Sequence, residues 1–196
     1  APETPFLGVG SLAIARDGTG WATAMGGWGS DPNGCLARLV GDRWEKVWPF
    51  DPGWDCTATV VASPSGDIWV TGEARPPAFN QSWGLNGVAA QFDGGAWTVY
   101  GEADGLPGVS GGQALAFTPD GTAWVTTWEG IARLDGTRWT MVVDDGRYYG
   151  PIAAAPDGSL YLAATSAWLL IDPVHRRMQL PASLDGSLPL NPGLNA

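Results

Sequence analysis

An internal repeat constrains the fold of this chain more than any other feature of its sequence. Four segments share one pattern, in which an apolar stretch is followed by a turn of the Asp-Gly or Ser-Gly type and by a second apolar stretch with an aromatic residue near its start. Because an Asp-Gly pair readily adopts the positive φ of a tight hairpin, each segment predicts two antiparallel strands. The four segments are residues 11–23, 58–71, 114–126 and 152–163.

A second half-repeat follows each of these segments and again predicts a strand, a hairpin and a strand. Three copies keep a Trp on the last strand, whereas Met178 stands in its place in the fourth copy, whose hairpin has also changed. Four antiparallel strands that recur every ~40 to 50 residues are typical of a β-propeller blade. We therefore predict an all-β fold, a β-propeller built of four four-stranded antiparallel blades. The second half-repeats are residues 36–47, 88–99, 131–142 and 168–180.

The predicted propeller is a single domain over residues 1–196. The blades either close as a four-blade ring or form part of a larger propeller, because an open stack leaves sheet faces and edges uncovered. The sequence leaves both arrangements open. The expected blades are about 10–50, 56–101, 112–144 and 150–182, and residues 183–196 are a tail or the start of a further blade.

The charge and hydropathy of the chain argue against two classes of partner, nucleic acid and the membrane interior. A net charge of −10 argues against nucleic acid, whose phosphates need an excess of Lys and Arg. No apolar run approaches the ~18 to 20 residues that span a bilayer, so no direct membrane insertion is expected. The chain begins with Ala1-Pro2 rather than Met, which fits a mature end after signal cleavage or a trimmed chain. With its pair of cysteines, this predicts an extracytoplasmic protein that is secreted, periplasmic or at the cell surface.

The third unit carries a family resemblance. Residues 119–127 followed by 130–139 resemble the repeat of the two-component-regulator propellers, and Gly105-Leu106-Pro107 is similar to a Gly-Leu-Pro that often follows the last strand in that family. The resemblance implies a propeller fold and a role in the periplasmic sensor region of a bacterial histidine kinase. Residues 67–73 are also similar to the repeat of the streptogramin lyases, which implies a His base near the channel. The only His, His175, is expected in a short turn on the other side.

Propeller topology sorts the loops into two faces. The turns between strands 1 and 2 and between strands 3 and 4 form a short-turn face, whose Asp residues are expected to stabilise the turns. The loops between strands 2 and 3 and the blade connections form a long-loop face. Aromatic residues that recur at one position in successive blades predict packing between blades. They are Trp21, Trp69, Trp124 and Tyr161 on the second strand, and Trp44, Trp97 and Trp139 on the outer strand.

The aromatic residues outside this repeat fall on the long-loop face or its edge, together with several acids. They either fold down as lids over a small core or form a binding surface, since Trp and Tyr dominate binding hot spots. The second interpretation predicts a carbohydrate-like or cationic ligand, or a protein partner. The candidate ligand-binding residues are Trp28, Trp48, Trp54, Trp83, Tyr100, Trp128, Tyr148, Tyr149 and Trp168, with Asp55 and Glu129.

No catalytic motif accompanies this face. A single His cannot supply a Ser-His-Asp or Cys-His arrangement, so a non-catalytic recognition or sensor module is expected rather than an enzyme. The alternatives are a carbohydrate-active or lyase-type propeller enzyme that uses carboxylates, and a structural subunit that self-assembles. No cofactor is expected. Calcium at Asp144-Asp145 or at Glu102 and Asp104 is a weaker prediction, because the twelve-residue calcium loop is missing.

The two cysteines predict one disulfide. Cys35 stands at the start of the third strand of unit one, and Cys56 at the start of the first strand of unit two. Both strand starts lie on the long-loop face in the up-and-down order of a blade, so the two residues can meet at the ~4.4 to 6.8 Å Cα separation of a disulfide. Two unrelated buried thiols are the alternative.

Overall fold

The computed structural model describes residues 9–24, 36–47, 54–74, 86–106, 114–164, 167–172 and 177–180. These residues hold sixteen strands in four antiparallel sheets, and within each sheet the strands lie in the order in which they follow in the chain.

Blade 1 contains β1 (Val9–Ile14), β2 (Gly20–Ala24), β3 (Leu36–Val40) and β4 (Arg43–Val47). Blade 2 contains β5 (Trp54–Ala62), β6 (Ile68–Ala74), β7 (Asn86–Phe92) and β8 (Trp97–Tyr100). Blade 3 contains β9 (Ala114–Phe117), β10 (Ala123–Thr126), β11 (Gly130–Asp135) and β12 (Arg138–Asp144). Blade 4 contains β13 (Tyr149–Ala154), β14 (Leu160–Ala164), β15 (Ala167–Ile171) and β16 (Arg177–Leu180), and a short 3-10 helix (Glu102–Asp104) follows blade 2.

The first hairpin of each blade closes as its sequence predicts. Its glycine adopts a positive φ in every blade, for example 88° at Gly18 and 86° at Gly121. The preceding Asp accepts a backbone hydrogen bond across the turn, from Thr19 to Asp17 at 2.8 Å and from Thr122 to Asp120 at 3.1 Å. These bonds confirm the structural role expected for the turn aspartates.

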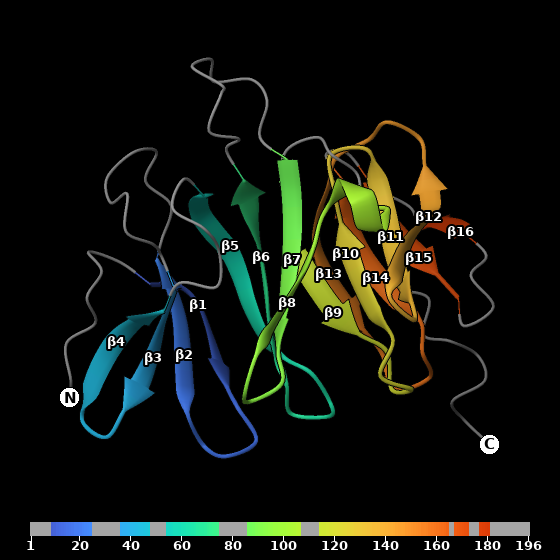
Figure 1. The fold of residues 1–196 in the computed structure, drawn as a ribbon. Coiled ribbons are helices and arrows are strands. Elements are labelled where there is room, and N and C mark those ends of the chain that lie inside the picture. Colours follow the sequence, from blue (N-terminus) through green and yellow to red (C-terminus); the bar gives the residue numbers. More distant parts are fainter. Residues whose placement is uncertain are drawn as a thin grey trace, which may run out of the picture.

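The four blades follow one another along an arc, with their first strands toward the inside (Figure 1). One apolar cluster fills each gap between blades and uses side chains from the facing sheets. Strand contacts and apolar clusters join blade 1 to blade 2, blade 2 to blade 3 and blade 3 to blade 4, and among the described residues nothing comparable joins blade 4 to blade 1, so the described blades form an open arc and not a closed four-blade ring. The predicted fold class of four four-stranded blades is confirmed.

The recurring aromatic residues build these gaps. Trp21, Trp69 and Trp124 are all buried in the gaps between blades, and the outer-strand Trp of the next blade approaches Trp21 and Trp69 edge-on. The ring of Trp97 lies 6.0 Å from that of Trp21, and the ring of Trp139 lies 6.4 Å from that of Trp69. The predicted packing between blades is therefore confirmed for these five residues.

Two of the repeated aromatic residues, one in blade 1 and one in blade 4, are not buried between blades. Tyr161 is 41% exposed, and Trp44 is half-buried against its own blade, beside Gly20 and Leu39. The expectation that every repeated aromatic is buried between blades is wrong for these two. In the described part of the chain, no blade precedes Trp44 and none follows Tyr161.

Hydroxyl groups tie neighbouring blades near their first strands. The Ser11 hydroxyl accepts a hydrogen bond from the Val60 amide at 2.8 Å, and the Thr126 hydroxyl donates to the Gly150 carbonyl at 3.0 Å. Both join consecutive blades. Among the described residues, no helix is long and apolar enough to cross a membrane.

Candidate functional site

Two aromatic rings meet on the long-loop face between blades 3 and 4. Trp128 lies in the loop from β10 to β11, and Tyr148 lies in the connection from β12 to β13. Their ring centroids are 4.7 Å apart with 48° between the planes. Trp128 is 48% exposed, a large fraction for a Trp, so this aromatic platform of Trp128 and Tyr148 offers ring surface to a ligand.

A buried hydroxyl shapes the loop that carries Trp128. The Thr127 hydroxyl oxygen accepts hydrogen bonds from the amides of Glu129 and Gly130 at 3.1 and 3.0 Å, and its own proton faces the Gly130 carbonyl at 3.2 Å. These contacts close a tight local turn of the kind that Ser and Thr favour. Thr127 itself is buried, which leaves Trp128 pointing outward.

Backbone hydrogen bonds join this loop to the segment that carries Tyr148. The Glu129 carbonyl accepts from the amides of Asp145 and Gly146 at 3.3 and 3.0 Å. The Tyr149 hydroxyl donates to the Asp145 carboxylate at 2.9 Å. The platform therefore rests on a fixed backbone frame, and the carboxylates of Glu129 and Asp145 belong to the same two segments.

Two of the predicted ligand-binding residues belong to the core. Tyr100 stacks on Trp69 with 5.6 Å between centroids and 6° between planes, and its hydroxyl donates to Gln91 at 3.4 Å. Burial, and then the charge of Asp104, raise the pKa of the Tyr100 phenol. Tyr149 is only 1% exposed. Their burial corrects the expectation that both lie on the binding face: each turns inward at a strand end and fills a gap between blades.

The structure brings together Trp128, Tyr148 and Glu129 of the predicted set. Trp54 and Asp55 lie in β5 and Trp168 lies in β15, but the side chains of these three are not described. Three further candidates lie outside the described residues, namely Trp28, Trp48 and Trp83.

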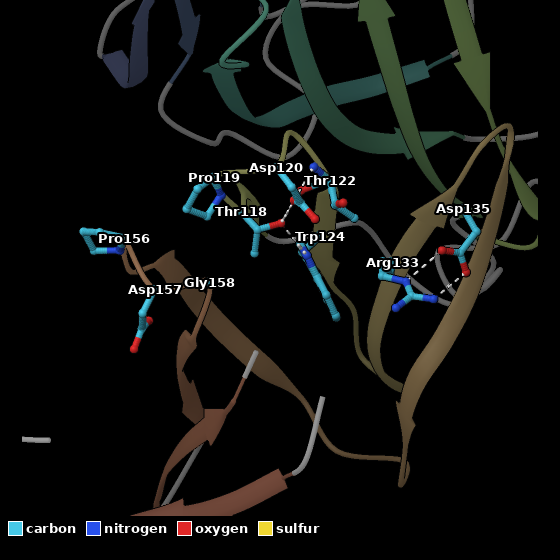
Figure 2. A pocket seen from close by; sticks show the side chains of 10 residues that line it. All are labelled: Thr118, Pro119, Asp120, Thr122, Trp124, Arg133, Asp135, Pro156, Asp157 and Gly158. Carbon is cyan, nitrogen blue, oxygen red and sulfur yellow. Dashed lines mark hydrogen bonds and ion pairs between the residues drawn. The ribbon is translucent and has the colours of Figure 1, made fainter. Parts of the chain in front are cut away.

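A second site was missed by the sequence interpretation. A cleft of about 460 Å³ opens between blades 3 and 4 on the short-turn face (Figure 2). Arg133 lies over the Trp124 ring, 5.8 Å from its centroid, and pairs with Asp135 through Nε at 2.8 Å and Nη2 at 3.0 Å. The signal for this arrangement was the Arg that faces the second-strand Trp in register, present as Arg133 and again as Arg38.

The charged groups of the cleft are already engaged by the protein. Hydrogen bonds from Thr118 and the Thr122 amide lower the pKa of Asp120, and those from Ser159 lower the pKa of Asp157. Arg133 is neutralised by its neighbour Asp135. The platform instead offers exposed ring surface, so it is the stronger candidate for ligand binding.

The metal and disulfide predictions remain open. Within the described ranges, no group of three or more His, Cys, Asp or Glu residues is arranged to hold a metal ion. Calcium at Asp144-Asp145 or at Glu102 and Asp104 stays a prediction. Cys35 and His175 lie outside the described residues, and Cys56 lies in β5 with its side chain not described. The disulfide therefore also stays a prediction.

Comparison with known proteins places the fold. No family model matches the chain, and no curated protein does. A gluconolactonase from Xanthomonas campestris matches at 13% identity and a TM-score of 0.60, over 87% of this chain and 61% of that one. A streptogramin B lyase matches at 16% identity and a TM-score of 0.59, over 89% and 54%. The extracellular domain of a one-component system from B. thetaiotaomicron matches at 13% identity and a TM-score of 0.62, over 88% and 22%.

These matches and the four blades agree. The chain is a β-propeller. It spans 61% and 54% of the lengths of the first two matching structures. At such low identity the likeness shows the fold alone, and the two-component-regulator family stays a resemblance.

The comparison also corrects the expectation that this chain is not an enzyme. That expectation rested on the absence of a His-based catalytic motif. The same fold carries a gluconolactonase and a streptogramin B lyase among the matching structures. The propeller scaffold is therefore compatible with catalysis, and a motif search designed for other folds gives no reason to exclude it.

Proposed function

We propose that this protein binds a carbohydrate-like molecule on its long-loop face, with the aromatic platform as the contact surface. The supporting observation is the exposed Trp128 ring, packed against Tyr148 on a hydrogen-bonded frame. The apolar face of a sugar ring packs well on such rings, and its hydroxyl groups are donors for carboxylate oxygens. Glu129, which is half-buried beside Trp128, supplies such a carboxylate, whereas the Asp145 carboxylate is already engaged by Tyr149 and Arg147.

We propose further that the bound molecule is converted, so that the chain is part of a carbohydrate-active or lyase-type propeller enzyme. The specific support is the likeness to the gluconolactonase and to the lyase. Carboxylates are the general acids and bases that this sequence offers near the platform. A lactonase step breaks the ring C–O bond of a lactone by water attack and releases an acid, whereas a lyase step removes a proton, expels a leaving group and forms a C=C bond.

An extracytoplasmic location belongs to the same proposal. It is supported by the match to an extracellular domain and by the acidic composition, which fits a soluble exported domain.

Binding is tested by calorimetric titration with a panel of monosaccharides, oligosaccharides and sugar lactones. Trp128→Ala should weaken binding of the best ligand at least about tenfold, the usual scale for a central aromatic contact. Val99→Ala, which removes an exposed apolar side chain from β8 of blade 2, is the matched control and should bind normally. Equal affinity of Trp128→Ala and the parent for every ligand would exclude the platform.

Conversion is tested separately on the same panel, by acid release for a lactonase and by ultraviolet absorbance of a new double bond for a lyase. Glu129→Gln should lose turnover while it keeps binding. Glu45→Gln, an exposed acid on β4, is the matched control. Binding without turnover of any substrate would reject the enzymatic part and leave recognition as the function.

A further inference from the structure

The outward faces of blades 1 and 4 resemble the two surfaces that pack together between neighbouring blades inside the arc. Inside the arc, the outer-strand Trp of one blade lies edge-on against the second-strand Trp of the blade before it. The interplanar angle is 81° for Trp97 on Trp21 and 86° for Trp139 on Trp69. The gaps between blades 1 and 2 and between blades 2 and 3 therefore each combine one Trp from the preceding blade with one from the following blade, whereas the chain has Met178 at the outer-strand position of blade 4.

Blade 1 exposes the face that, in blades 2 and 3, packs against the preceding blade. Leu12 and Ile14 are each 65% exposed. In blade 1, Leu12 comes directly before the residue that pairs with the second-strand Trp. Val60 and Leu115 hold the same position in blades 2 and 3. Their side chains are only 2% and 5% exposed. In blades 2 and 3 this position is therefore buried against the preceding blade, and its copy in blade 4, Ile152, is half-buried against the cluster between blades 3 and 4.

Trp44 belongs to the same face of blade 1. It pairs with Leu39 across β3 and β4, in the register that joins Trp139 to Leu134 in blade 3. Trp139 reaches the preceding blade and is 2% exposed, whereas Trp44 is half-buried on its own sheet. The outer-strand Trp of blade 1 thus lacks the partner ring that its interior counterparts have in the described structure.

Blade 4 exposes the face that, in blades 1 to 3, packs against the following blade. Tyr161 occupies the second-strand position of Trp21, Trp69 and Trp124 and is 41% exposed, whereas none of those three exceeds 4%. Tyr161 pairs with Leu170 on β15, which is itself only half-buried. An aromatic and aliphatic surface is left open where a following blade belongs.

We propose that these end faces bind each other between two copies of this chain, with blade 1 of one copy on blade 4 of the other. The contact places Trp44 of one copy near Tyr161 of the other and covers Leu12 and Ile14, as every interior gap does. Two such contacts close a ring of eight blades and remove both open faces.

The proposal is tested by light scattering during size exclusion over a range of protein concentrations. The parent chain should form a species of twice its 20.5 kDa mass. Leu12→Glu and Tyr161→Glu should each dissociate it. Val40→Glu is the matched control, because Val40 is 44% exposed on the opposite face of blade 1 and its substitution should leave the dimer intact. Circular dichroism verifies that each variant is folded.

Mixing the two dissociated variants distinguishes a head-to-tail contact from a symmetric one. The Leu12→Glu chain keeps an intact blade 4 face and the Tyr161→Glu chain keeps an intact blade 1 face, so an equimolar mixture should form a dimer through one good contact. If mixing the two variants does not restore a dimer, the proposal is overturned, since identical patches would then be in contact. A parent chain that stays monomeric at every concentration also overturns it.

Discussion

The Trp139 ring of blade 3 lies edge-on against the Trp69 ring of blade 2, with 6.4 Å between centroids and 86° between planes. The contact joins the second-strand Trp of one blade to the outer-strand Trp of the next, two residues that are far apart in the chain. It predicts that the outer-strand tryptophans differ in their contribution to stability according to how completely a neighbouring blade covers them.

Replacing Trp139 by Ala should lower the free energy of unfolding by about 3 to 5 kcal/mol, because it leaves a cavity in a closed gap. Trp97→Ala should cost less, since that residue is only partly buried. Trp44→Ala should cost least when the protein is monomeric, because Trp44 is half-buried on its own sheet and none of the other described blades packs against it. Urea unfolding of the three variants measures the order, and equal losses would contradict it.

Gly130→Ala should destabilise both the fold and the platform. Gly130 has a φ of 155°, and a Cβ there would collide with the Val143 carbonyl oxygen. The loss should exceed about 2 kcal/mol, since backbone strain and the clash add. Gly121→Ala is the matched control, because its φ is 86° but its Cβ would meet no atom within 4 Å. It should lose only the strain of a left-handed residue, about 1 to 2 kcal/mol.

Stability should fall in acid as the turn aspartates are protonated. Backbone hydrogen bonds lower the pKa of Asp17, Asp93 and Asp157 below the ordinary value of 3.8, and a hydrogen bond from Thr118 contributes most at Asp120. Because the folded pKa lies below the unfolded one, the stabilisation is present above pH 3.8 and is lost as the pH falls through the folded pKa.

The measurement is the urea midpoint across this acid range for the parent and for a chain with all four residues changed to Asn. The parent should lose stability more steeply than the variant. Parallel curves would show that these carboxylates do not carry the pH dependence.

The predicted disulfide between Cys35 and Cys56 is checked by intact mass after alkylation, with and without reductant, on protein from its natural source. One disulfide protects both thiols until reductant is added, and its loss should cost roughly 3 kcal/mol in the chain-entropy interpretation. Two thiols that react without reductant would reject the disulfide and weaken the case for export.

The sequence by itself determined the strands, the hairpins and the residues between blades. These are local or repeated signals: an Asp-Gly pair such as Asp120-Gly121 determines its turn, and a Trp that recurs on the second strand packs toward the blade that follows. That is why the blade pattern and the interior roles of Trp69 and Trp139 were predictable.

Only the tertiary structure decided which unrepeated aromatic residues face outward. Tyr148 and Tyr149 are adjacent in the chain, yet Tyr148 joins Trp128 at the surface while Tyr149 fills the gap between blades 3 and 4. Tyr149 is the first residue of β13 and Tyr148 lies in the connection before it, and which of the two is covered depends on the neighbouring blade, which no local pattern specifies. The exposure of Tyr161 has the same origin, since its counterparts are buried only because another blade follows them.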